Sequence, residues 1–425
     1  MLLISDASTS KPASSTTTKP PSSTTVVTTT VKPSSTTVVT TTVKPSSTTI
    51  ATTTKPVTTT AVSSTTTSAS ATAVPSGSIP YASGTSFVID GKKQYFAGTN
   101  SYWIGFLTNN ADIDLVMSHL AESGEKVLRV WGFNDVTSIP SADTVYYQSF
   151  INGVASINTG PNGLQRLDYV VKSAEAHGIK LIVNFVNNWK DYGGMAAYFS
   201  YAGISSNQEW YTSAKAQAQY QAYIKAVVSR YPNSPAIFAW ELSNEARCNG
   251  CATSVLANWV AKTAAYIKSL DSKHMVATGE EGMGLPGDGS YPYQYGEGGN
   301  FTATCSDPNI DFCTYHLYPD SWTVGPAKEW GNAWIQAHAK ICVALNKPCV
   351  LEEFGQMNTC ASELAWETTA LNTPGTGGDM FWQYGDTLSW GQTSQDGNTV
   401  YYKDSLWQCM VAPHIADVMA KNGGA

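Results

Sequence analysis

Two glutamates stand at the ends of apolar runs that are typical of buried strands. Residues 237–245 end in Trp-Glu-Leu-Ser-Asn-Glu, and residues 349–355 end in Leu-Glu-Glu-Phe-Gly. Two carboxyl groups held about 5 Å apart can cleave a glycosidic bond with retention, because one protonates the leaving oxygen while the other attacks the anomeric carbon. We therefore expect Glu245 and Glu353 to form such a pair, although either glutamate taken alone is more often a structural ion-pair partner.

The alternation of side chains along a strand predicts the directions in which the neighbouring glutamates point. If Glu353 points toward the reacting centre, Glu352 should point away from it. Glu241 should share the face of Glu245 and lie deeper in the fold. We therefore expect neither Glu352 nor Glu241 to react with a substrate.

Short apolar runs alternate with segments of helical period from residue 78 onward, which predicts a parallel sheet wrapped by helices. Such a pattern predicts a (β/α)8 TIM barrel, in which polar residues at the C-terminal ends of strands form the active site. A doubly wound sheet is the alternative, but no Gly-rich loop follows the first run. The expected strands are residues 96–102, 127–133, 181–187, 237–245, 275–282, 310–318, 349–355 and 379–384, and the expected helices are residues 112–123, 164–177, 208–230, 254–270, 327–345 and 362–371.

An N-terminal β-hairpin is expected over residues 87–96, with Asp90-Gly91 at its turn, where it would plug the floor of the barrel. Residues 1–77 are rich in Ser, Thr and Pro and contain a recurring Lys-Pro-Ser-Ser-Thr-Thr unit. This composition predicts a disordered, O-glycosylated linker before a catalytic domain at residues 78–425. A linker of this kind suggests a missing N-terminal carbohydrate-binding module.

The eight cysteines all lie between Cys248 and Cys409, and their even number is typical of the disulfide framework of a secreted, extracellular protein. Pairing sequence neighbours joins Cys248 to Cys251, Cys305 to Cys313 and Cys342 to Cys349, and leaves Cys360 with Cys409. Sequence does not fix this connectivity. A zinc or redox site at Cys248 and Cys251 is the alternative, and the absence of a second Cys/His pair with suitable spacing disfavours it.

The formal net charge of −7 disfavours nucleic acid and anionic membranes as partners. Only 13% of residues are charged, while the chain has 13 Trp and 22 Tyr, a balance that suits neutral polyols as well as an aromatic-rich core. No stretch is apolar enough over about 18 residues to span a membrane. We expect a monomer that uses no metal and no cofactor.

Five elements in chain order resemble glycoside hydrolase family 5. They are Arg129 in the second expected strand, Asn244-Glu245, His316-Leu317-Tyr318, Glu353-Phe354-Gly355, and Trp382 in the last expected strand. Within that family, residues 186–194 and 244–251 are similar to those of fungal endo-β-1,4-mannanases. Two departures stand out, because family members commonly have Pro at the position of Ala246 and many cellulases have His where this chain has Asn187 and Asn188.

The resemblance implies retaining hydrolysis of β-1,4-mannosidic bonds in mannan, glucomannan and galactomannan, with Glu245 as acid/base and Glu353 as nucleophile. It also implies that Arg129 and Tyr318 keep Glu353 ionised, that Asn244 binds the sugar 2-hydroxyl, that His316 orients the acid/base or the substrate, and that Trp382 forms the floor of the cleavage site. Trp103, Trp189 and Arg247 would line neighbouring sugar subsites.

Three further interpretations stay open from the residues. A β-1,4-glucanase would use the same glutamates, and a non-catalytic carbohydrate-binding barrel would lack one of them. A structural cell-wall protein would account for the Ser/Thr-rich tail but not for the polar residues at the strand ends. The sequon Asn300-Phe301-Thr302 is expected to carry an N-linked glycan.

Overall fold

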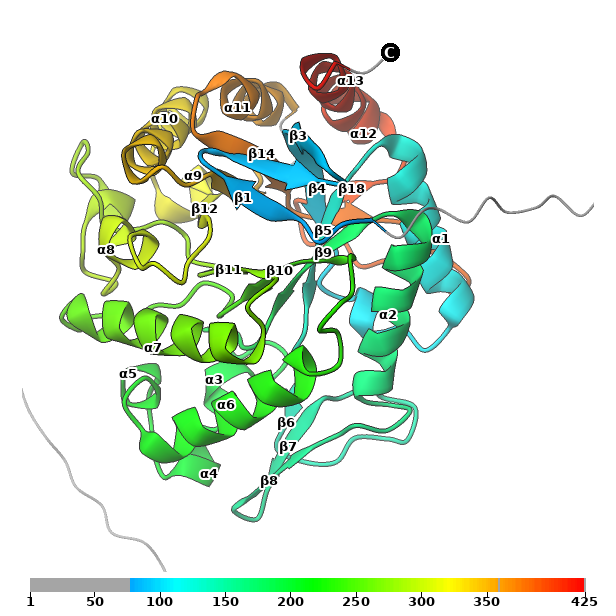
Figure 1. The fold of residues 1–425 in the computed structure, drawn as a ribbon, viewed down its shortest axis with the longest axis vertical. Helices are drawn as coiled ribbons and strands as arrows, with labels where there is room; N and C mark the ends of the chain where they lie inside the picture. The colour runs from blue at the N-terminus through cyan, green and yellow to red at the C-terminus, as the bar shows by residue number, and fades with distance from the viewer. Residues whose placement is uncertain (1–76, 358–359, 424–425) are drawn as a thin grey trace, which may run out of the picture. The chain divides into compact units, whose positions relative to one another are not determined.

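The computed structural model describes residues 77–357 and 360–423, so the expected linker lies almost entirely outside the described residues. Eight parallel strands form one sheet in the order β11-β10-β9-β5-β4-β14-β13-β12 (Figure 1). Every expected strand is present, which confirms the (β/α)8 barrel. Their bounds are β4 Phe96–Asn100, β5 Val127–Trp131, β9 Lys180–Asn184, β10 Ile237–Glu241, β11 Met275–Ala277, β12 Cys313–Leu317, β13 Cys349–Phe354 and β14 Thr376–Phe381.

Helices surround the strands (Figure 1) and end where the sequence offers a stop. Helices α1 and α2 both end at a glycine in the left-handed conformation, Gly124 and Gly178, which glycine adopts without a steric penalty. The helix expected over residues 208–230 is interrupted, because Ser213 caps a new helix by accepting a hydrogen bond from the backbone N–H of Ala216. The main helices are α1 Asn110–Ser123, α2 Leu164–His177, α5 Asn207–Trp210, α6 Ala214–Val228, α7 Ser254–Leu270, α10 Ala327–Leu345, α11 Cys360–Asn372, α12 Ser405–Cys409 and α13 Val411–Lys421.

The expected hairpin is part of a three-stranded antiparallel sheet, β1 Tyr81–Ser83, β2 Ser86–Ile89 and β3 Lys92–Gln94. Its Phe87 is fully buried and lies among Phe96, Phe238 and Phe312, with ring centroids 5.6, 5.0 and 5.3 Å away. These rings belong to an apolar cluster to which most of the barrel strands contribute. The hairpin therefore plugs the barrel floor, as the sequence predicted.

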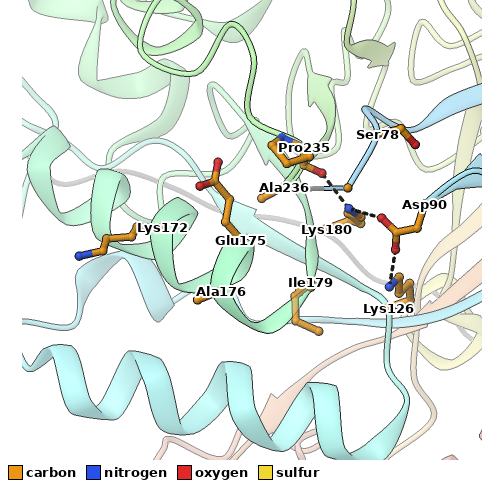
Figure 2. Close-up of a pocket in the computed structure, with 12 residues that line it drawn as sticks. Ser78, Asp90, Lys126, Lys172, Glu175, Ala176, Ile179, Lys180, Pro235 and Ala236 are labelled. Atoms are coloured by element: carbon orange, nitrogen blue, oxygen red, sulfur yellow. Dashed lines mark hydrogen bonds and ion pairs between the residues drawn. The ribbon is translucent and has the colours of Figure 1, made fainter. Parts of the chain in front are cut away.

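Two lysines anchor the hairpin turn to the barrel. Asp90 pairs with Lys126 at 2.7 Å and with Lys180 at 2.8 Å, and these lysines stand at the starts of β5 and β9 (Figure 2). Together they hold the pKa of the partly buried Asp90 below its usual value against the opposing effect of burial. The hollow beside this turn has a volume of about 730 Å³ and lies at the N-terminal ends of the strands, away from the end where barrel chemistry is expected.

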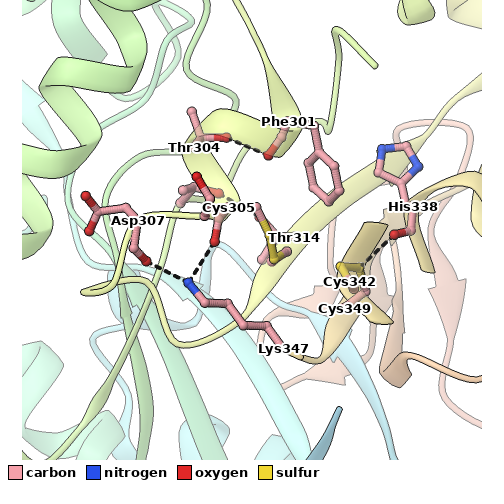
Figure 3. Close-up of a disulfide and its surroundings, with 12 residues drawn as sticks. Phe301, Thr304, Cys305, Asp307, Thr314, His338, Cys342, Lys347 and Cys349 are labelled. Carbon is pink, nitrogen blue, oxygen red and sulfur yellow. Dashed lines mark hydrogen bonds between the residues drawn. A yellow bond between two sulfur atoms is a disulfide. The ribbon is translucent and has the colours of Figure 1, made fainter. Parts of the chain in front are cut away.

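The barrel is closed between β11 and β12 by contacts of Asp311. Its backbone N–H donates to the carbonyl of Val276 at 2.9 Å, and its carboxylate accepts from the N–H of Val276 at 2.7 Å. The Cys305–Cys313 disulfide ties helix α8 (Phe301–Cys305) to β12 beside this seam (Figure 3). Lys347 donates to the carbonyls of Cys305 and Asp307 at 2.7 and 2.6 Å and so reinforces the same joint.

The remaining disulfides join Cys248 to Cys251, Cys342 to Cys349 and Cys360 to Cys409. All eight cysteines are thus paired as sequence neighbours suggested, and Cys248 and Cys251 are bonded to each other, which contradicts the zinc alternative. Within residues 77–357 and 360–423, no helix is long and apolar enough to cross a membrane.

Long loops at the C-terminal ends of the strands carry small elements of their own. The loop after β5 folds into the strands β6–β8, the loop after β9 into short helices, and the loop after β14 into two short strand pairs. The bounds are β6 Asp135–Val136, β7 Gln148–Ile151, β8 Val154–Ile157, η1 Ile104–Phe106, α3 Gly194–Ala197, α4 Phe199–Ala202, η2 Tyr291–Tyr293, α9 Pro319–Trp322, β15 Tyr384–Gly385, β16 Thr387–Leu388, β17 Gly391–Gln392 and β18 Val400–Tyr401.

We predict that Phe87→Ala lowers the free energy of unfolding by about 3–5 kcal/mol, because it leaves a cavity under the barrel. Urea unfolding followed by tryptophan fluorescence measures this change. Tyr81→Ala is the matched control, since Tyr81 belongs to the same small sheet but is 52% exposed, and its effect should be about 0.5 kcal/mol or less. Equal stability of the two variants would contradict the plug.

Candidate active site

A cleft of about 500 Å³ opens at the C-terminal ends of the barrel strands. Both expected catalytic glutamates line it, and so do most of the expected substrate-binding residues. Three expected residues lie outside the lining: Arg129 and His316 are fully buried, and Trp103 is partly buried against the core beside η1. The lining comprises Trp131, Asn187, Trp189, Asp191, Asn244, Glu245, Arg247, Glu281, Tyr291, Tyr318, Ser321, Trp322, Glu353, Trp382 and Asn398.

Glu245 and Glu353 come close together across this cleft. One side-chain oxygen of each lies within 4.8 Å of the other, and His316 lies within the same distance of both. Retaining glycosidases hold their carboxyls about 5–5.5 Å apart, whereas inverting enzymes need about 6.5 Å or more for a water molecule. The separation therefore fits direct attack by one carboxylate. Such a trio could also hold a metal ion, but its polar atoms already bond to Trp189, Tyr318 and Arg129.

The backbone beyond β10 is shaped to present Glu245. Glu245 itself has φ of 51°, in the left-handed region that non-glycine residues rarely adopt, and its N–H donates to the carbonyl of Gly279 at 2.8 Å. A Cβ at Gly279 would lie 2.0 Å from the carbonyl oxygen of Ser243, so only glycine fits this close approach. Strain of this kind persists where the surrounding structure enforces it, often at functional sites.

Glu353 is surrounded by donors that favour its ionised form. Arg129 donates through Nη1 to one carboxylate oxygen, and the Tyr318 hydroxyl donates to the other at 2.8 Å. His316 Nδ1 lies 3.6 Å from the same oxygen as Tyr318. Both contacts expected of Arg129 and Tyr318 are therefore present.

Glu245 has a different environment. Its Oε2 accepts a hydrogen bond from Trp189 Nε1, and its Oε1 lies 2.8 Å from His316 Nδ1. Burial raises the pKa of Glu245, and the hydrogen bond from Trp189 and the charge of Arg247 oppose that rise. Arg247 lies with its guanidinium carbon 5.1 Å from the Trp189 ring centroid, so these two residues form one wall beside the acid.

The two carboxyls affect each other's ionisation. Burial raises the pKa of Glu353 as well, the charges of His316 and Arg129 oppose that rise, and the charge of Glu245 adds to it. Two close carboxylates resist ionising together, so the pair loses its first proton from the better stabilised member. Arg129 donates directly to Glu353 and makes no such contact with Glu245, so this geometry favours the ionised form of Glu353.

Arg129 binds four partners below the cleft. Its Nε and Nη2 donate to Glu241, at distances down to 2.8 Å, and Nη2 also donates to Asn244 Oδ1 at 2.8 Å. Nη1 donates to Asn100 Oδ1 at 3.2 Å in addition to Glu353. The deep position expected of Glu241 is confirmed, and its role is to hold the guanidinium.

The prediction that Glu352 points away from the site is wrong. β13 pairs with β12 through Leu351 opposite Tyr315 and then Glu353 opposite His316, so Glu352 is an extra residue in a bulge. Glu352 is fully buried, and its Oε2 lies 3.5 Å from His316 Nε2 and 3.7 Å from Arg129 Nε. Both consecutive glutamates therefore face the barrel interior, one beneath the other.

Asn244 and Trp382 lie where a sugar would meet the pair. Asn244 Nδ2 donates to Asn187 Oδ1 at 3.0 Å, which orients the amide while its second N–H stays available to a ligand. The Trp382 ring stacks on Tyr102, with centroids 5.6 Å apart and planes 9° from parallel, and its Nε1 donates to Asp396 at 2.8 Å. The peptide bond from Trp382 to Gln383 is cis.

Glu281 is a site residue that the sequence analysis missed. It binds Arg247 through both oxygens, at 2.5 and 2.6 Å, and Arg247 in turn donates to the hydroxyl of Tyr291 at 3.0 Å. Burial and the neighbouring charge of Glu245 raise the pKa of Glu281 to about 7, against the effect of Arg247. Glu281 is the last polar residue of the fifth expected strand, so the rule that selected Glu245 would have found it too.

Comparisons with known proteins agree with this geometry. The family model described as GH family 5 beta-mannosidase-like matches residues 80–384. The probable mannan endo-1,4-beta-mannosidase A-2 of Aspergillus terreus is 60% identical over 81% of this chain and 88% of its own length. The mannan endo-1,4-beta-mannosidase A of Aspergillus aculeatus is 60% identical over 81% of this chain and 92% of its own.

Solved structures show the same fold. The endo-1,4-beta-mannanase from Rhizomucor miehei superposes with a TM-score of 0.74 and 33% identity, over 81% of this chain and all of that one. The endo-beta-1,4-mannanase from Thermotoga petrophila gives a TM-score of 0.66 and 31% identity, over 78% of each chain. With a barrel of this kind, a close pair of glutamates at strand ends and these matches over most of its length, the chain belongs to the β-mannosidase-like group of glycoside hydrolase family 5.

Proposed function

We propose that this protein is a retaining endo-1,4-β-mannanase in which Glu245 is the acid/base and Glu353 the nucleophile. The observation that carries the mechanism is the approach of the two carboxyls to within 4.8 Å in a cleft at the strand ends. The relatives that are 60% identical are named mannan endo-1,4-beta-mannosidases, which supports mannan as the substrate.

The reaction proceeds by double displacement. A carboxylate oxygen of Glu353 attacks the anomeric carbon while the Glu245 proton moves to the glycosidic oxygen, so one C–O bond forms as the other breaks. Glu245, now ionised, then takes a proton from water, whose oxygen attacks the same carbon and releases Glu353. The cycle restores both carboxyls and needs no further group.

The positions around the pair suit this sequence of events. Arg129 and Tyr318 neutralise the charge of Glu353 before attack, and they stabilise it again when it leaves. Asn244, held by Asn187 and Arg129, offers its free N–H to the sugar 2-hydroxyl, a contact that strengthens as positive charge develops at the ring. Trp382 and Trp189 line the cleft, where aromatic rings can pack against neighbouring sugar rings.

A β-1,4-glucanase is the second candidate, because it would use the same carboxyl pair. Mannose and glucose differ in the orientation of the C2 hydroxyl, which is the group that Asn244 would meet. The asparagines at positions 187 and 188 favour the mannanase, since many cellulases of the family have a histidine in that region.

Secretion fits four disulfides in the described part of the chain. We propose that the protein acts outside the cell on β-mannan, as a monomer, with residues 78–425 as the catalytic domain. An N-terminal carbohydrate-binding module and O-glycosylation of the linker stay predictions. Asn300 is partly exposed while its side-chain oxygen caps α8, so its amide nitrogen remains available for a glycan.

We predict that Glu245→Gln and Glu353→Gln each lower kcat on galactomannan by about 10²-fold or more, because each removes a reacting carboxyl without changing its shape. Reducing-sugar release measures the loss, and proton NMR of the first product should show the β-anomer that retention requires. Wild-type activity in either variant, or an initial α-anomer, would refute the assignment.

We predict that the full chain releases reducing ends from galactomannan and glucomannan at least about tenfold faster than from carboxymethyl-cellulose, a difference of about 1.4 kcal/mol in transition-state binding. Size-exclusion analysis of early products distinguishes internal cleavage from release of terminal sugars. Faster hydrolysis of the cellulose derivative would favour the glucanase.

We predict that Trp189→Phe moves the alkaline limb of the kcat/KM profile upward by up to about one pH unit. The Trp189 N–H stabilises the ionised form of Glu245, so its loss raises the pKa of the acid and keeps it protonated to higher pH. Trp322→Phe is the matched control, because Trp322 lines the same cleft against Tyr318. A downward shift for Trp189→Phe would contradict the assignment of Glu245 as the acid.

A further inference from the structure

The carboxyls beneath the cleft outnumber the cations that face them. Glu241, Glu352 and Glu353 all approach the Arg129 guanidinium, from β10 and β13. The other titratable neighbour is His316 on β12, which lies 3.5 Å from Glu352, and burial lowers its pKa. If all three carboxyls were ionised, this buried layer would hold two negative charges in excess with a neutral His316 and one with a charged His316, an arrangement that proteins avoid by retaining protons.

Glu352 is the carboxyl best placed to keep a proton. Arg129 donates directly to Glu241 and Glu353, whereas Glu352 lies no nearer than 3.7 Å to it. The Oε1 atom of Glu352 is buried and receives no hydrogen bond, while its Oε2 and both oxygens of Glu241 surround the same Arg129 Nε, at 3.7 Å and 3.1 Å. An ionised carboxylate so deeply buried would need donors at both oxygens.

The backbone fixes Glu352 in this place. The bulge in β13 turns its side chain inward, and Asn100 Nδ2 holds the bulge by donating to the Glu352 carbonyl at 2.9 Å. Asn100 also accepts from Arg129, so the same amide links the bulge to the guanidinium. Burial and the charge of Glu241 raise the pKa of Glu352 well above its usual value, which agrees with the geometry.

We propose that Glu352 is a positioning residue that stays a neutral carboxylic acid, donates its proton to the Glu241 carboxylate, and thereby leaves the Arg129 charge free to hold Glu353 ionised. This inference rests on the assignment of Glu353 as nucleophile. Because Glu352 is uncharged, it adds no repulsion to Glu353 one residue away. Because it donates to Glu241, it satisfies a carboxylate that would otherwise draw Arg129 away from Glu353.

The test is the acidic limb of the kcat/KM profile on mannan, which reports ionisation of Glu353. Glu352→Gln keeps the shape, the neutrality and a donor toward Glu241, so its acidic limb should coincide with that of the wild type. If Glu352 were ionised in the working enzyme, the same change would remove a negative charge and move the limb down by about one pH unit. That downward shift would overturn the proposal.

Glu352→Met tests the donated proton itself, because a methionine side chain is neutral but has no hydrogen to donate to Glu241. We expect its acidic limb to move up by about one pH unit and kcat/KM below the limb to fall about tenfold, since Glu241 then competes for Arg129. If the acidic limb of Glu352→Met coincided with that of the wild type, the donated proton would have no effect on the ionisation of Glu353, and the proposal would be wrong. Thermal unfolding checks that each variant folds. If Glu352→Gln failed to fold while Glu352→Asp folded, that result would also count against a neutral Glu352.

Glu367→Gln is the matched control for replacing a buried carboxyl. Glu367 is buried on α11 beside Asp379 and His414, in a cluster separate from the cleft, so its acidic limb should match the wild type. A different result would refute the proposed function: Glu353→Gln would remain active, whatever the Glu352 variants do.

Discussion

The Arg129 guanidinium is the interaction on which the site depends. It is fully buried on β5, and its planar fork reaches Glu241 on β10, Asn244 beyond β10 and Glu353 on β13 at the same time. A fixed fork of donors imposes geometry as well as charge, which a flexible ammonium would not. Removing it would leave buried carboxylates without compensation, and an unpaired buried charge costs about 3–5 kcal/mol. The position of the nucleophile and the orientation of Asn244 therefore have one common origin.

The barrel makes this arrangement possible by separating an apolar layer from a polar one. Phe87, Phe96, Phe238 and Phe312 close the floor, and the inward residues one step higher on the strands are Arg129, Glu241 and Glu352. Apolar packing below excludes water, which strengthens the ion pairs above it. The hairpin that contributes Phe87 is thus coupled to the chemistry at the other end of the barrel, although it contacts no reacting group.

The sequence predicted the strands and the catalytic pair because both depend on local patterns. Apolar runs of strand length identified all eight strands, and polar residues at their ends pointed to Glu245 and Glu353, whereas Tyr318 came from the resemblance to glycoside hydrolase family 5. The bulge that turns Glu352 inward could not be predicted, because it is set by the register between β12 and β13 and leaves no mark on the alternation of residue types. The place of Trp103 in a sugar subsite stays a prediction, because an aromatic residue after a strand can pack on the core or face the cleft, and only the loop geometry decides. The break between α5 and α6 depends on one residue, Ser213, which caps the start of α6.

The seam between β11 and β12 passes through the acid/base side of the site. Glu281 follows β11 and His316 lies on β12, and the His316 N–H donates to the Glu281 carbonyl at 3.2 Å across the seam. Movement there would displace His316 from Glu245 and Glu281 from Arg247 together.

The Cys305–Cys313 and Cys248–Cys251 disulfides stand beside these groups, and their sequence separations are only 8 and 3. A cross-link that closes about 15 residues stabilises by about 3 kcal/mol through the unfolded chain, and shorter loops give less. Their main effect is therefore local: Cys305–Cys313 ties α8 to the start of β12, and Cys248–Cys251 closes the turn that follows Arg247.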